Sequence, residues 1–248
     1  MLKMNHVTAV KVPPSLQGYA AKMRLWDAIG LPPPEQSFFF DASGAYLPME
    51  PLRSRQEVHD CGLRVAQIAQ MARMKEESRG SLETAMSELI DNCFAHAGVS
   101  GPLHGLVSAQ TWTKGRLLQI AIADCGMGIR QSFVTADTEE WRLRAQQENC
   151  CSLATELGAS SKLTKDHAGY GLALARQLAE KNGGTMIVVS GTEFCRVDKS
   201  GEQLGEFRCA WPGTLIILEF DTSKPLSTQA VYQTWPPVRG YTDDDFDF

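Results

Sequence analysis

The chain has 248 residues, of which 43% are hydrophobic and 21% charged, and its formal net charge at pH 7 is −5. This composition is typical of a folded globular protein, and an acidic chain without a cluster of Lys and Arg residues argues against direct binding of nucleic acid. The longest apolar runs, residues 117–123 and 214–218, are far shorter than the roughly 20 residues that a helix needs to span a bilayer, so we expect no membrane association.

The N-terminal sequence and the cysteines together indicate a cytoplasmic protein. The opening segment, MLKMNHVTAVKVPP, lacks the apolar stretch and the small-residue cleavage site of a secretory signal. The seven cysteines are odd in number and contain no CxxC pair, so they predict neither a disulfide framework nor a zinc site. We therefore expect free thiols in a reducing compartment.

The first third of the chain predicts two helices with a strand-forming segment between them. Residues 15–29 repeat apolar side chains at helical spacing and stop at the breaker GLPPPE, and residues 57–75 show the same periodicity. Between them, SFFFDASGAYLPMEPL carries aromatic strand formers interrupted by turn residues. We predict a small N-terminal α/β module, residues 1–79, that serves in partner docking or in forming a homodimer.

The middle of the chain predicts a helix, a hairpin and a long polar connection. The helix is expected over residues 81–97, and the hairpin pairs residues 103–112 with residues 116–124 around the turn TKG. The polar stretch that follows contains a predicted helix at residues 137–157. A connection of this length inside a compact domain is usually a functional loop or lid.

The last third predicts one helix, two strands and a tail. The helix, residues 171–181, ends at NGG, which is a typical C-terminal stop. The strands, residues 185–190 and 213–220, are joined by a long excursion through residues 194–211. The tail, residues 223–248, ends in the acidic YTDDDFDF and is expected to be disordered.

Three short motifs carry the chemistry. In ELIDNCFAH the spacing i, i+4 places Glu88, Asn92 and His96 on one face of a helix. A carboxylate acts as a general base or an ion ligand, and an amide oxygen suits Mg²⁺. DCGMG puts Asp124 at the end of a strand beside two glycines, and GYGL places glycine amides at a helix N-terminus, which favours anions. Together the three motifs predict a nucleotide site.

In their order and spacing these motifs resemble the GHKL superfamily, which embraces gyrase B subunits, heat-shock chaperone ATPases, histidine kinases, MutL proteins and anti-sigma-factor kinases. ELIDNCFAH is similar to the N box, DCGMG to the first glycine box and GYGLAL to the second. The resemblance implies an α/β (α+β) fold, the two-layer Bergerat sandwich, with helices on one face of a mixed β-sheet. We expect it in residues 80–222, with a lid at residues 128–169.

The resemblance also implies roles for individual residues. Asn92 would ligate Mg²⁺, Asp124 would accept the adenine amino group beside Thr214, and Glu88 would activate water. The pocket and the phosphate contacts would come from backbone groups of Gly126, Gly128, Gly169, Gly171 and Leu172.

Some positions leave alternatives open. His96 would contact phosphate or pack against the lid, and Lys165, like Lys162, would reach the γ-phosphate or stay solvated. The second glycine box departs from the usual pattern because Ala168 and Ala173 replace two glycines, which puts the hinge freedom of the lid in doubt.

Three functions fit these motifs. The first is a Mg-ATP-binding protein, a slow ATPase whose lid closure signals to an unidentified protein partner. The second is an anti-sigma-type protein-serine kinase, and the third is a nucleotide-sensing scaffold without turnover. A histidine kinase that uses His59 lacks room for its second helix, Cys93 has no orienting partner for nucleophilic catalysis, and no P-loop sequence occurs.

Overall fold

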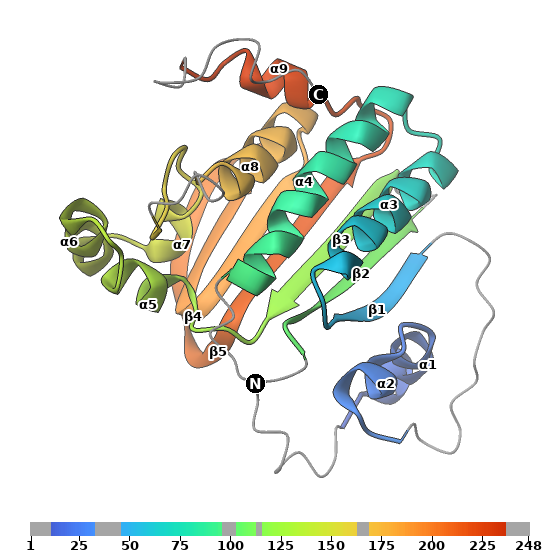
Figure 1. The fold of residues 1–248 in the computed structure, drawn as a ribbon. Helices are drawn as coiled ribbons and strands as arrows, with labels where there is room; N and C mark the ends of the chain where they lie inside the picture. The colour runs from blue at the N-terminus through green and yellow to red at the C-terminus, as the bar shows by residue number, and fades with distance from the viewer. Residues whose placement is uncertain (1–10, 33–45, 96–102, 113–115, 163–168, 237–248) are drawn as a thin grey trace.

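The computed structural model describes residues 11–32, 46–95, 103–112, 116–162 and 169–236 (Figure 1). Its sheet has five strands in the order β1-β2-β3-β5-β4. The strands are β1 (Tyr46–Leu52), β2 (Gly105–Trp112), β3 (Leu117–Asp124), β4 (Thr185–Asp198) and β5 (Gly201–Asp221). Three long helices, α3 (Gln56–Met71), α4 (Glu76–Ala95) and α8 (Gly171–Asn182), cover one face of the sheet. The two-layer α/β fold class is therefore confirmed.

The strand pairing differs from expectation in one respect. All four described pairings are antiparallel, whereas a mixed sheet was expected. The reason is that β4 and β5 form one hairpin and β5 inserts between β3 and β4. β5 thereby runs opposite to both neighbours. The expected hairpin of β2 and β3 is confirmed, with Gly105 opposite Asp124 and Trp112 opposite Leu117.

Helix α4 owes its position to a buried apolar seam that faces the sheet. The seam repeats at helical spacing through Leu82, Ala85, Met86, Leu89, Ile90 and Cys93, each at most 2% exposed. This pattern leaves Glu88 and Asn92 on the flank of the helix, where Glu88 is exposed and Asn92 is half-buried. The helix begins at Glu76 rather than at residue 81, so the boundary expected between residues 79 and 80 falls inside it.

The N-terminal segment contains two helices where one was expected. Residues 15–29 form α1 (Pro14–Lys22) and α2 (Leu25–Ile29), because Arg24 adopts a left-handed conformation with φ of 52° that ends the first helix. Met23 then accepts a hydrogen bond from the Met49 amide at 3.0 Å, which ties this segment to the edge strand β1. Helix α3 similarly stops at Met71 instead of residue 75.

The lid region also breaks up more than expected. The helix predicted at residues 137–157 is two helices, α6 (Glu139–Gln147) and α7 (Cys150–Leu153), and α5 (Ile129–Val134) precedes them. Glu148 separates α6 from α7 because its backbone is extended, and the Asn149 side chain caps α7 by accepting from the Ser152 amide at 3.0 Å.

The prediction of a long excursion between the last two strands is wrong. β4 and β5 continue as a hairpin to a turn in which Asp198 pairs with Gly201. The tail is also ordered further than expected: α9 (Thr228–Tyr232) follows β5, and Leu226 and Val231 are at most 1% exposed. The acidic residues 237–248 lie outside the described part of the chain. Within the described part, no helix has both the length and the apolar character that crossing a bilayer requires.

Candidate functional site

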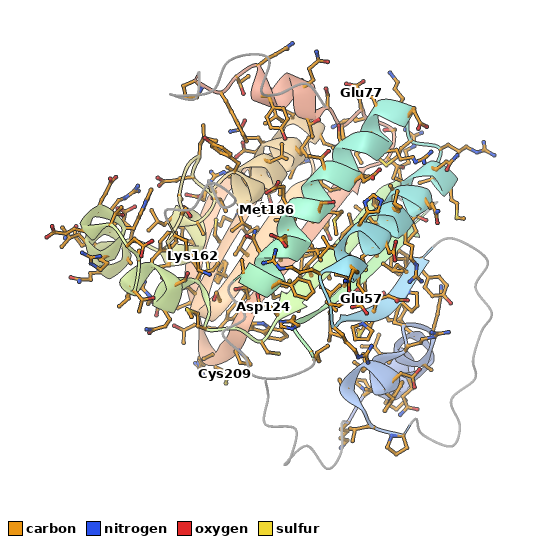
Figure 2. All side chains as sticks on the ribbon, viewed as in Figure 1. Glu57, Glu77, Asp124, Lys162, Met186 and Cys209 are labelled. Atoms are coloured by element: carbon orange, nitrogen blue, oxygen red, sulfur yellow. The ribbon has the colours of Figure 1, made fainter. Side chains whose placement is uncertain are left out.

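Asp124, at the end of β3, lies at the centre of one end of the candidate site (Figure 2). We call it the adenine end, and the opposite end the phosphate end, after the ligand groups that the GHKL resemblance implies there. Its Oδ1 accepts hydrogen bonds from the Gly126 amide at 2.7 Å and from the Thr214 amide at 3.2 Å. Burial raises the pKa of this carboxyl group above its ordinary value, while the hydrogen bonds from Gly126 and Thr214 oppose the shift. The site therefore holds a desolvated carboxylate that is fixed by its neighbours.

Ser190, in β4, joins the elements around Asp124. Its Oγ accepts a hydrogen bond from the Ile129 amide at 2.8 Å and donates one to the Gly213 carbonyl at 2.7 Å. One buried hydroxyl group thus links the segment after the first glycine box to β5 at Gly213. Ser190 was not predicted as a site residue from the sequence, where it stands at the end of the apolar run in VVSG.

Gly213 is a second residue that the sequence analysis missed. Its φ is +88°, and a Cβ atom at this position would lie 2.3 Å from the Asp124 carbonyl oxygen and 2.7 Å from Oδ1. Gly128 also has positive φ, at +81°, and its Cβ atom would lie 3.0 Å from Ser190 Oγ. The adenine end therefore requires glycine at two backbone positions.

Gly171 forms the phosphate end of the site together with Glu88 and Asn92. A Cβ atom on Gly171 would lie 3.1 Å from Glu88 Cβ, 3.3 Å from Glu88 Oε2 and 3.5 Å from Asn92 Nδ2. Gly171 is the first residue of α8, so the N-terminus of this helix lies directly against the polar flank of α4. A helix N-terminus of this kind favours an anion.

The base of the lid, where Gly158 meets Gly169, lies next to the phosphate end. The Gly158 amide donates to the Gly169 carbonyl at 3.2 Å, and a Cβ atom on Gly169 would lie 2.6 Å from the Ala159 carbonyl oxygen. Leu172 packs against the core from the first turn of α8. The Lys162 ammonium group donates to the carbonyl of Ala95, the last residue of α4 (Figure 2). His96 and Lys165 lie outside the described residues.

A partly buried ion pair fixes the first half of the lid. The Glu193 side chain, 7% exposed, accepts two hydrogen bonds from the Arg130 guanidinium group, at 2.9 and 2.6 Å. Arg130 also donates to the carbonyls of Ala145 and Glu148. The segment after the first glycine box is thereby attached to β4, an arrangement that no local sequence signal indicated.

The structure argues against the competing chemistries. The Cys93 thiol is 2% exposed, and burial raises its pKa, so it is a poor nucleophile. His59 lies on the surface of α3, with its side chain 69% exposed and 3.9 Å from Glu83. Among the described residues, His, Cys, Asp and Glu side chains do not gather in a group of three that would hold a metal ion unaided.

The chain matches a known family. A family model described as "Histidine kinase-like ATPase domain" matches residues 54–185, just over half of the chain. The matched segment contains α3, α4, β2, β3, the lid and α8, and so includes Glu88, Asn92, Asp124 and Gly171. A search of curated proteins finds no match to the chain.

Proposed function

Because the chain belongs to the histidine kinase-like ATPase domain family, whose domain binds ATP, we propose that it is a slow Mg-ATPase whose lid closure signals to a protein partner. The observation that carries this proposal is the contact of Gly171 with Glu88 and Asn92, which joins a helix N-terminus to a carboxylate and an amide. Anion binding, metal ligation and base catalysis would then take place in one small volume.

Asp124 would recognise the nucleotide base. A carboxylate accepts about four hydrogen bonds, and the Gly126 amide, the Thr214 amide and the Thr214 hydroxyl group use part of that capacity. The remaining capacity suits an exocyclic amino group such as that of adenine. A buried acceptor of this kind disfavours a base that presents a carbonyl group in the same place, because two acceptors would face each other.

Asn92 would hold the Mg²⁺ ion through its side-chain oxygen. Mg²⁺ commonly binds one or two protein oxygens and takes its other ligands from water and substrate phosphates, so a single amide next to the helix N-terminus fits this ion. When bound, the ion neutralises phosphate charge. The Gly169, Gly171 and Leu172 backbone would orient the phosphate groups, and the lid would exclude bulk water.

Glu88 would act as the general base. Its Oε2 lies at the N-terminus of α8, where a phosphate group would bind, so it is in a position to accept a proton from an attacking water molecule. The same geometry serves a partner's serine hydroxyl group equally well. The partner, a homodimer and a cytoplasmic location stay predictions.

The test measures ATP binding by calorimetry, with and without Mg²⁺, and phosphate release for the wild type and Glu88→Gln. Glu83→Gln is the matched control, because Glu83 lies on the same helix beside His59. We expect Glu88→Gln to retain ATP binding and to lose phosphate release by about a hundredfold or more, in line with the loss of a general base, while the control behaves as the wild type. Absence of ATP binding in the folded wild type would refute the proposal. Phosphate transfer only after addition of a partner would support the kinase instead.

A further inference from the structure

The segment from Leu226 to Trp235, which contains α9, connects the two helices of the phosphate end (Figure 1). We call this segment the C-terminal strap. On α4, Ser78 Oγ accepts from the Leu226 amide and Ser81 Oγ accepts from the Thr228 amide, both at 2.9 Å. Leu226 and Val231 are buried in the main core. The strap is thus firmly anchored on α4, although it lies beyond the matched segment, residues 54–185.

The other end of the strap is attached to α8. Trp235 Nε1 donates to the Gln177 side-chain oxygen at 3.0 Å, and the Thr234 hydroxyl group contacts the same oxygen at 3.3 Å. The Trp235 ring lies 5.3 Å from the Tyr170 ring and 5.0 Å from the Tyr232 ring, the latter edge to face. These centroid distances are in the range at which aromatic pairs stabilise a contact.

The aromatic cluster contacts α8 at the N-terminus of the helix, where the phosphate end lies. Tyr170 is the N-cap residue of α8 and directly precedes Gly171. Gly171 in turn leaves no space between itself and Glu88, so a displacement of Tyr170 changes the distance between the helix N-terminus and the carboxylate.

Tyr232, on the strap, lies within electrostatic range of the same carboxylate. Burial raises the pKa of its phenol group, and the negative charge of Glu88 adds to the shift. The phenol therefore stays neutral at physiological pH, close enough to Glu88 to sense its charge. The strap consequently contacts the phosphate end at Tyr170 and lies within electrostatic range of Glu88.

We propose that Trp235 is a positioning residue for nucleotide binding: by contacting Tyr170 and Tyr232 it holds the N-terminus of α8 against Glu88 and Asn92. This inference rests on the proposed function, because the geometry that Trp235 maintains is that of the phosphate end. Trp235 itself is not expected to touch the reacting atoms.

The experiment compares Trp235→Leu with the conservative variant Trp235→Phe. Trp211→Leu is the matched control, since Trp211 is 39% exposed on the β4–β5 hairpin. The measurements are the Kd for ATP with Mg²⁺ by calorimetry, KM and kcat for phosphate release, and the melting temperature. We expect Trp235→Leu to raise Kd and KM by about threefold to tenfold, the scale of one lost aromatic contact. We expect it to lower kcat by a larger factor, because the N-terminus of α8 moves away from Glu88. Trp235→Phe should stay within about twofold of the wild type, because it keeps the ring contact.

The outcomes separate positioning from general stability. Partial unfolding would lower the active fraction, and therefore kcat, and would leave KM unchanged. A folded Trp235→Leu protein with wild-type Kd and KM would overturn the inference while leaving the proposed function intact. Absence of ATP binding in the wild type would overturn both. If Trp235→Leu does not fold, Tyr170→Leu removes the same contact from the α8 side, and an unchanged Kd in that variant would equally overturn the inference.

Discussion

The adenine end and the phosphate end of the candidate site are built in different ways. At the adenine end, the Gly126 and Thr214 amides hold the half-buried Asp124 carboxylate, and the Ser190 hydroxyl group joins Ile129 to Gly213. These groups belong to the sheet or to the segment that follows β3. At the phosphate end, two helices meet at Gly171, and the strap and the base of the lid complete the contact. One end is fixed by hydrogen bonds within the sheet, and the other depends on packing between separate elements.

This difference predicts how each end fails. A change at the adenine end removes an acceptor or displaces a strand, so the affinity for ATP or the free energy of unfolding is expected to fall. A change at the phosphate end alters a distance between two helices, so turnover is expected to fall more than binding. The variants below test this contrast, beginning with the largest effect.

Gly213→Ala is expected to have the largest effect. Alanine at φ of +88° is strained, and its Cβ atom would lie 2.3 Å from the Asp124 carbonyl oxygen. We expect the free energy of unfolding to fall by about 2–4 kcal/mol and ATP binding to weaken with it. Chemical denaturation measures the first and calorimetry the second. Gly80→Ala is the control, because Gly80 lies in α4 with open space around it, and the variant should be as stable as the wild type or more so.

Asp124→Asn should weaken ATP binding by about tenfold to a hundredfold, since a hydrogen bond to a charged group contributes about 1.5–3 kcal/mol. The amide oxygen can still accept from Gly126 and Thr214, so the unliganded protein should be no less stable at pH 7. Calorimetry and thermal unfolding of the same samples check both statements. Equal affinity in the variant and the wild type would remove the adenine end from the site.

Gly171→Ala tests the phosphate end with a single methyl group. The new Cβ atom would lie 3.1 Å from Glu88 Cβ, so α8 and α4 must separate slightly. We expect phosphate release to slow by about fivefold to thirtyfold, which corresponds to a rise of roughly 1–2 kcal/mol in the activation free energy. The Kd for ATP should change less. A Kd that rises as much as kcat falls would contradict the proposed contrast between the two ends.

The pH dependence of stability should be the smallest effect. The pKa of Asp124 is raised in the folded state, so the folded protein binds the proton more strongly than the unfolded chain does. The contribution of this group to stability is therefore complete below the unfolded pKa of about 3.9 and is lost as the pH rises through the folded pKa. Asp124→Asn removes this dependence. The difference in melting temperature between variant and wild type should accordingly grow with pH over that window and then stay constant.

The elements with strong periodicity were predictable from the sequence. The buried seam of α4, the alternation of β2 and β3, and the glycine stop of α8 are local patterns, and the structure contains all three elements. The resemblance to the GHKL superfamily also implied that Thr214 would lie beside Asp124 and that Glu88, Asn92 and Gly171 would belong to one nucleotide site. Their chemical roles stay predictions.

The rest depends on contacts between distant residues. Arg24 adopts an unfavourable φ that no propensity indicates, and α5 to α7 are fixed by Arg130 on Glu193, residues 63 apart in the chain. The strap was predicted as part of a disordered tail because it has only two fully buried residues, Leu226 and Val231, which give no clear apolar pattern in the sequence. Ser190 and Gly213 were missed because a serine or a glycine at the end of a strand is common, and only the folded arrangement brings them to Asp124.

The attachment of Arg130 to Glu193 has a mechanical consequence. It attaches the residues from the first glycine box to α7 to β4, so they cannot swing without breaking a bidentate contact with the buried Glu193 carboxylate. The natural pivots beyond α7 are Gly158 and Gly169, which share a hydrogen bond and both have positive φ. Any movement of the lid on nucleotide binding is therefore expected to begin beyond α7.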